Sequence, residues 1–216
     1  MPAGWAKFGR TAAVGITLGL AVAAAVEAGS IFLGRNLHVV IPGEAYRCAQ
    51  LSHDQFVDTI RGHGIRTVVN LRGTSPEQDW YAAESQATFD ADISQEDITL
   101  SAYRLPSPDE LRRLIEVFDH SEYPILFHCR QGVDRTGLTA ALALLLYTDT
   151  GLDEARRQLS VRYSHFSLGR TTAMQRFFDL YAGWLDGRPH APGLFRRWAT
   201  EEYCPGPERG RLEVID

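Results

Sequence analysis

The chain has 216 residues, of which 44% are hydrophobic and 23% are charged, an ordinary globular composition with enough residues for one domain with a core. A net charge of -5 argues against a nucleic-acid partner, because proteins that bind nucleic acids usually carry a basic surface. Three cysteines, Cys48, Cys129 and Cys204, are too few for a disulfide framework, and no Cys/His cluster has metal-ligand spacing, so neither a metal nor another cofactor is expected.

Residues 1–34 contain a long apolar segment, Thr11–Leu33, with a single carboxylate. Its length is sufficient to span a bilayer, which needs ~20 residues. Lys7 and Arg10 precede it and are expected to stay cytoplasmic, so the rest of the chain would lie outside the cytoplasm. The segment therefore predicts a membrane anchor with one N-terminal span. A cleaved signal, with cleavage after Ala28 and a secreted or periplasmic product, is the alternative.

Residues 35–203 are predicted to form one domain in which strands and helices alternate. Its first half is expected to contain strands at 38–41 and 45–48 around a turn, a helix at 53–63 that begins at the cap residue Ser52, a strand at 65–71 and a helix at 76–90. Arg72, at the end of the third strand, would either reach a phosphate or form a surface ion pair with a Glu.

The second half continues the same alternation. It is expected to contain a strand at 98–101, a helix that begins with the capping box Ser107-Pro108-Asp109-Glu110, a strand at 124–127, an entirely apolar helix at 138–147, and helices at 153–163, 171–186 and 193–203 before a loose tail, 204–216. This order predicts an α/β fold with a mainly parallel central sheet and helices on both of its sides, preceded by the N-terminal apolar helix.

The loop at 128–137, His-Cys-Arg-Gln-Gly-Val-Asp-Arg-Thr-Gly, lies between a buried strand and a buried helix. A tight loop that leads into a helix N-terminus binds anions, because its backbone N–H groups and the helix dipole point to one spot. The same potential favours the thiolate of Cys129, which is the nucleophilic form. Arg135 can hold two oxygens of a phosphoryl group, and Thr136 can hydrogen-bond the sulfur.

The pattern His-Cys-x-x-Gly-x-x-Arg-Thr-Gly resembles the signature of the cysteine-dependent tyrosine and dual-specificity phosphatases, and Pro42 to Gln50 is similar to the start of the domain in bacterial and fungal members. The resemblance implies a cysteine-phosphatase-like fold with Cys129 as nucleophile and His128 supporting the loop. It implies that the substrate's phosphoryl group is held by Arg135 and by the remaining loop residues, Arg130, Gln131, Gly132, Val133 and Thr136.

The proton donor is harder to identify from the sequence. The family resemblance places an Asp near Ser101, and no Asp is present there. Asp97 and Asp109 are the nearest carboxylates, and Asp109 is equally explained by the dipole of its helix. Asp134 resembles a loop Asp of myotubularin-type and bacterial triple-specificity phosphatases, so it is the leading candidate, with an outward salt bridge as the alternative role.

These patterns predict a phosphomonoester hydrolase that acts on a phosphorylated protein or a small phosphorylated ligand through a phosphocysteine intermediate. The alternatives are a phosphoinositide or inositol-phosphate phosphatase, a phospho-ligand binding module without turnover and, more distantly, a sulfurtransferase. Cys48 is expected to be a small buried residue, with redox pairing to Cys129 as the alternative.

Overall fold

A five-stranded sheet forms the centre of the computed structural model, which describes Gly19 and residues 35–160 and 172–206. The strands are β1 (His38–Ile41), β2 (Ala45–Cys48), β3 (Thr67–Asn70), β4 (Ser94–Asp97) and β5 (Ile125–His128), and their order across the sheet is β1-β2-β5-β3-β4. Only β1 is antiparallel to its neighbour. The predicted mainly parallel sheet is confirmed, and β5 lies at its centre.

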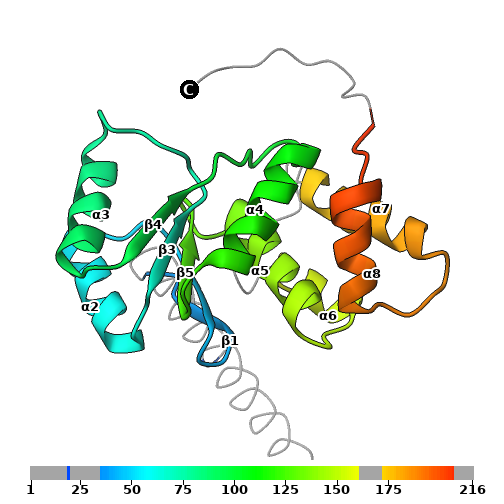
Figure 1. The fold of residues 1–216 in the computed structure, drawn as a ribbon, viewed down its shortest axis with the longest axis horizontal. Helices are drawn as coiled ribbons and strands as arrows, with labels where there is room; N and C mark the ends of the chain where they lie inside the picture. The colour runs from blue at the N-terminus through cyan, green and yellow to red at the C-terminus, as the bar shows by residue number, and fades with distance from the viewer. Residues whose placement is uncertain (1–18, 20–34, 161–171, 207–216) are drawn as a thin grey trace, which may run out of the picture. The chain divides into compact units, whose positions relative to one another are not determined.

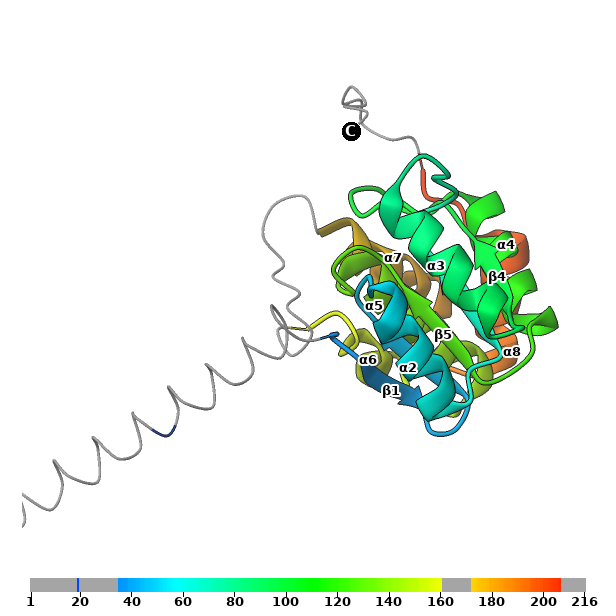
Figure 2. The ribbon, with the colours of Figure 1, turned by 90° about the vertical axis from the view of Figure 1, so that its left-hand side faces the viewer.

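Helices cover both faces of the sheet, as predicted (Figures 1 and 2). One face carries α2 (His53–His63) and α3 (Asp79–Asp90), and the other carries α4 (Pro108–His120) and α5 (Asp134–Tyr147). Successive side chains of a strand point to opposite faces. Leu126 of β5 accordingly joins the core cluster of Phe56 on α2, whereas Phe127 lies in the other cluster with Phe118 of α4.

The remaining helices extend the core beyond α5. They are α6 (Leu152–Arg156), α7 (Thr172–Leu185), α8 (Pro192–Arg197) and a π-helical turn, η3 (Trp198–Glu202). Phe177 of α7 lies against Phe195 and Trp198, with ring centroids 6.4 and 5.2 Å apart. These helices enclose α5, which is buried from Thr136 to Leu146, and its entirely apolar sequence is explained by this position.

Local capping fixes where α2 and α4 begin. Ser52 and Gln55 form a capping box at α2, and Ser107 and Glu110 form another at α4. Each box satisfies two backbone N–H groups that the helix itself leaves without partners. Gly64 ends α2 with a φ of 64°, which a glycine adopts without strain. These boundaries confirm the predicted ones.

Two predicted elements are wrong. The strand expected at 98–101 lies instead at Ser94–Asp97, a polar edge strand without apolar alternation. Ile98 and Leu100 are buried because the chain turns back into the core there. The helix expected at 153–163 ends at Arg156, and residues 157–159 form turns in which Leu159 lies close to Gly137 of α5. The last part of this prediction, 161–163, lies outside the described residues.

Apart from Gly19, the N-terminal apolar helix lies outside the described residues, and so does most of the C-terminal tail. The described elements from β1 onward belong to a unit that begins at Leu37. Within the ranges that the structure describes, every helix is too short or too polar to cross a membrane. The membrane anchor and the domain bounds 1–34, 35–203 and 204–216 therefore stay predictions.

The loop after β5 crosses the end of β2 at Gly132. This residue has a φ of 68°, and a Cβ atom placed on it would lie 2.6 Å from the Cys48 carbonyl oxygen and 2.8 Å from the Ala49 nitrogen. Both groups are backbone and cannot move aside without distorting β2. The crossing therefore requires a glycine.

We expect Gly132→Ala to lower the free energy of unfolding by more than about 1 kcal/mol, because it combines a strained φ with a backbone clash. Urea unfolding measures this change. Gly62→Ala is the control: its Cβ would meet nothing within 4 Å on α2, so it should stabilise the chain by up to about 1 kcal/mol. Equal stability of Gly132→Ala and the parent would contradict the claim that the loop needs a glycine where it crosses β2.

Candidate active site

Cys129 directly follows the central strand β5, at the edge of the sheet where the parallel strands end. Ligands of open α/β sheets bind at this edge. The Cys129 side chain is only 4% exposed and lies beneath the loop 129–133, which leads into the first turn of α5 with Asp134, Arg135 and Thr136. Arg130 and Gln131 are exposed at the loop's outer side, whereas Gly132 and Val133 are buried.

The carbonyl groups of this loop are held from outside. Arg47 of β2 is fully buried and donates from Nη2 to the Gly132 oxygen at 2.8 Å and from Nη1 to the Gln158 oxygen at 2.9 Å. The backbone N–H of Gln50 donates to the Arg130 oxygen at 3.3 Å. Because these carbonyls point outward, backbone N–H groups turn inward, and those of Val133 and Thr136 reach the sulfur of Cys129.

The environment of Cys129 favours the thiolate. Burial would raise the pKa of the Cys129 thiol, but the charge of the Arg135 guanidinium, with the polar groups of Thr136 and Val133, outweighs burial and holds this pKa below its usual value. The buried Thr136 hydroxyl has no hydrogen-bond partner of normal geometry in the described part of the chain. The loop can thus both hold an anion and supply a nucleophile.

Arg135 is positioned by the ends of neighbouring strands. Its Nη1 donates to the Leu71 oxygen at 3.2 Å and to the Leu100 oxygen at 3.4 Å. Leu71 follows β3 and Leu100 follows β4, so two adjacent connections fix the guanidinium beside Cys129. This leaves the rest of its planar fork for phosphoryl oxygens.

Arg72 adds a second cation near Arg135. It donates to Gln50 Oε1 at 2.8 Å and its guanidinium carbon lies 3.4 Å from the centre of the Trp80 ring. Burial, and then repulsion from Arg135 and Arg130, hold the pKa of Arg72 below its usual value. The repulsion indicates that the three guanidinium groups lie close enough to share one region. Of the two roles predicted for Arg72, the surface ion pair with a Glu is not formed within the described residues, where Arg72 contacts Gln50 and Trp80 instead, and the phosphate contact stays a prediction.

His128, the residue before Cys129, points to the other face of the sheet. Its Nε2 lies 2.8 Å from Glu84 Oε1, and both side chains are fully buried. Glu84 Oε2 accepts from Gln50 Nε2 at 3.0 Å. Three residues that hold the loop were not predicted from the sequence: Arg47, Gln50 and Glu84. The available signals were a charge inside the short β2 strand and a Glu four residues after Trp80 on the buried stripe of α3.

The three acid candidates are placed differently. Asp109 is 90% exposed and pairs with Arg112 at 2.5 Å, so it points to solvent from the start of α4. Asp97 ends β4 and accepts from Asn70 Nδ2 at 2.8 Å and from the Tyr81 hydroxyl, which makes it an anchor of the surrounding loops. Asp134 is half-buried and begins α5 directly after the loop.

Cys48 lies beside the loop but faces away from Cys129. It pairs with His128 across β2 and β5, is fully buried, and packs in the cluster with Phe56 and Ile60. Cys129 belongs to the cluster on the opposite face. The interpretation of Cys48 as a small buried residue fits this arrangement. Within residues 35–160 and 172–206, no group of three or more His, Cys, Asp or Glu side chains is placed to hold a metal ion.

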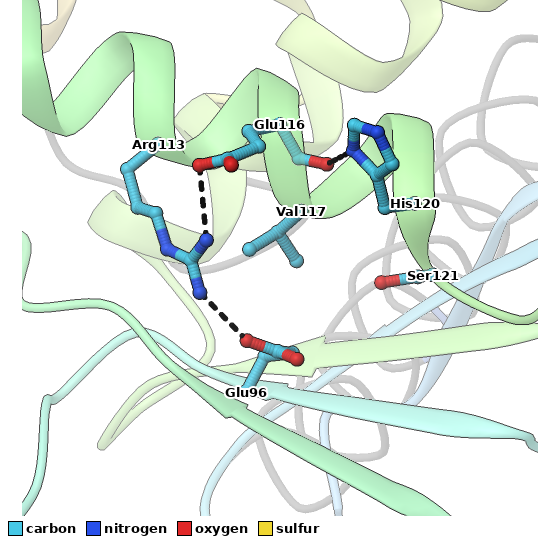
Figure 3. Close-up of a pocket in the computed structure, with 6 residues that line it drawn as sticks. All are labelled: Glu96, Arg113, Glu116, Val117, His120 and Ser121. Atoms are coloured by element: carbon cyan, nitrogen blue, oxygen red, sulfur yellow. Dashed lines mark hydrogen bonds and ion pairs between the residues drawn. The ribbon is translucent and has the colours of Figure 1, made fainter.

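Figure 3 shows a separate pocket between α4 and β4. It is lined by Glu96, Arg113, Glu116, Val117, His120 and Ser121, none of which belongs to the loop 128–137. Arg113 bridges Glu96 at 3.0 Å and Glu116 at 2.9 Å (Figure 3). The pair with Glu96 joins α4 to the edge strand β4, and the pair with Glu116 lies within α4, so carboxylates of the chain itself already neutralise the Arg113 cation.

Comparisons with known proteins agree with the geometry. A family model described as the tyrosine phosphatase family matches residues 33–156, more than half of the chain. A comparison with curated proteins gave no match.

Solved structures share the fold. TpbA of P. aeruginosa is 20% identical, with a TM-score of 0.52 over 67% of this chain and 83% of that one. The core catalytic domain of the PP-IP phosphatase SIW14 from S. cerevisiae is also 20% identical, with a TM-score of 0.53 over 68% of this chain and 85% of that one. The chain therefore belongs to the tyrosine phosphatase family and is a cysteine-dependent phosphatase.

Proposed function

We propose that this phosphatase hydrolyses phosphate monoesters of tyrosine or of serine and threonine through a phosphocysteine intermediate on Cys129. The thiolate attacks phosphorus, a sulfur–phosphorus bond forms, and the bond between phosphorus and the ester oxygen breaks. Arg135 and the amides of residues 130–135 hold the phosphoryl oxygens, where negative charge is greatest. The leaving oxygen takes a proton from an acid, for which Asp134 is the proposed group.

In the second step water attacks phosphorus and the sulfur–phosphorus bond breaks. The same Asp134, now ionised, would accept a proton from the water, phosphate would leave, and the thiolate would be restored. The Thr136 hydroxyl beside the sulfur would stabilise it as the leaving group. His128 would support the start of the loop.

The observation that carries this proposal is the buried Cys129 sulfur beside Arg135, with its thiol pKa held below the usual value. A protein substrate is supported by a relative of the same fold: TpbA of P. aeruginosa has been crystallised with phosphotyrosine. A phosphotyrosine ring would bring its phosphate down to the loop while the peptide stays outside.

Replacing the nucleophile tests the proposal. We expect Cys129→Ser to abolish phosphate release from a phenyl phosphate, because a hydroxyl is not ionised here, while inorganic phosphate still binds to Arg135 and the amides. Steady-state release and calorimetric phosphate binding measure the two properties. Cys204→Ser, at an exposed cysteine, should leave turnover unchanged. Undiminished turnover in Cys129→Ser would exclude the mechanism.

A second candidate is an inositol-phosphate phosphatase, favoured by the guanidinium groups of Arg72 and Arg130 near Arg135. SIW14, of the same fold, is a PP-IP phosphatase. For such a substrate Arg72→Ala should lower kcat/KM about tenfold or more, since a hydrogen bond to a charged group contributes about 1.5–3 kcal/mol, with a smaller loss for phenyl phosphate. Equal losses for both substrates would count against inositol phosphates.

A further inference from the structure

Glu84 is a buried carboxylate that belongs to neither the loop nor α5. It lies on α3, is fully buried, and contacts His128 Nε2 at 2.8 Å and Gln50 Nε2 at 3.0 Å. An ionised carboxylate inside a protein is costly unless donors and cations compensate it. Trp80 and Ala87, three or four positions away on the same face of α3, show that an apolar residue would suit this position.

Hydrogen bonds lead from Glu84 through the Gln50 side chain to Arg72, and in each of them the donor and the acceptor are determined. The Gln50 amide donates from Nε2 to Glu84 and accepts at Oε1 from Arg72 at 2.8 Å. The carboxylate thus faces the amide nitrogen and the guanidinium faces the amide oxygen. If the Gln50 side-chain amide were turned over, its oxygen would face the Glu84 carboxylate and its nitrogen would face the Arg72 guanidinium. The two charged groups therefore fix the orientation of this amide together.

The proton on His128 is fixed in the same way. Its Nδ1 is buried and has no hydrogen-bond partner in the described part of the chain, whereas Nε2 lies on Glu84. A neutral ring with the proton on Nε2 leaves Nδ1 without a hydrogen that needs an acceptor. Glu84 therefore acts as the acceptor for two donors, one from the start of the loop and one from Gln50.

His128 and Gln50, which both form hydrogen bonds with the Glu84 side chain, contact the active-site loop or its neighbours. His128 precedes Cys129, and its carbonyl accepts from the Leu71 amide at 2.9 Å. The backbone amide of Gln50 also holds the Arg130 carbonyl. We propose that Glu84 is a positioning residue of the phosphatase, which through His128 orients the start of the loop and through Gln50 orients Arg72. This inference rests on the proposed function of the loop.

Because the donor and the acceptor between Gln50 and Glu84 are determined, exchanging the two side chains tests the proposal. In Glu84→Gln the new amide can still accept from His128, but its nitrogen then faces the Gln50 nitrogen, and one amide must turn. In Gln50→Glu two carboxylates meet. In the double variant Gln50→Glu/Glu84→Gln the amide at position 84 donates to the carboxylate at position 50, which also accepts from Arg72, and every contact is restored.

We expect each single variant to lower kcat/KM for phenyl phosphate by about tenfold or more, because small displacements at a reacting centre have large effects. The double variant should recover most of this loss, a coupling that distant or independent sites do not show. Inorganic phosphate affinity, measured by calorimetry, should follow the same order. Thr67→Val is the matched control.

Thr67 is buried on β3 and donates to the Glu122 oxygen at 2.8 Å, at the end of the strand away from the loop. Its replacement should lower thermal stability and leave kcat/KM unchanged. Unchanged kcat/KM and phosphate affinity in Glu84→Gln, or losses that add in the double variant, would overturn the inference. A parent protein that binds phosphate without releasing it from substrates would overturn the proposed function alone, since phosphate affinity still reports on Glu84.

Discussion

An anionic sulfur is stable inside a protein only where cations and amide dipoles surround it closely enough to outweigh its loss of hydration. The charge of Arg135 and the amides of Val133 and Thr136 meet this condition at Cys129. The central strand β5 places the sulfur, and the connections after β3 and β4 place the guanidinium. The chemistry of the site depends on keeping these two groups together.

Several distant elements maintain this arrangement. Arg47 reaches from β2 to the Gly132 carbonyl and to Gln158, so the strand, the loop and the segment after α6 are joined by one buried side chain. Gly132 lets the loop pass directly over β2. On the opposite face, Glu84 joins α3 to His128 and Gln50. The loop is therefore held from both faces of the sheet.

The features that could be predicted from the sequence have local causes. Capping boxes at Ser52 and Ser107, and the fully apolar α5, depend on residues a few positions apart, and the strand–loop–helix around Cys129 is contiguous. The features that could not be predicted depend on partners far away in the sequence. The polar strand β4 is defined by pairing with β3, and Arg47 and Glu84 acquire their partners only when α3, β2 and the loop meet.

Titration of the Cys129 sulfur tests the central claim most directly. The ultraviolet absorbance of the thiolate, taken as the difference from Cys129→Ser, should appear as the pH rises through a pKa below about 8.5, the value of a free thiol. In Arg135→Met the cation is absent and burial, the largest opposing influence, should move the transition above that value. A parent thiol that titrates at or above about 8.5, or a transition that Arg135→Met leaves in place, would contradict the account.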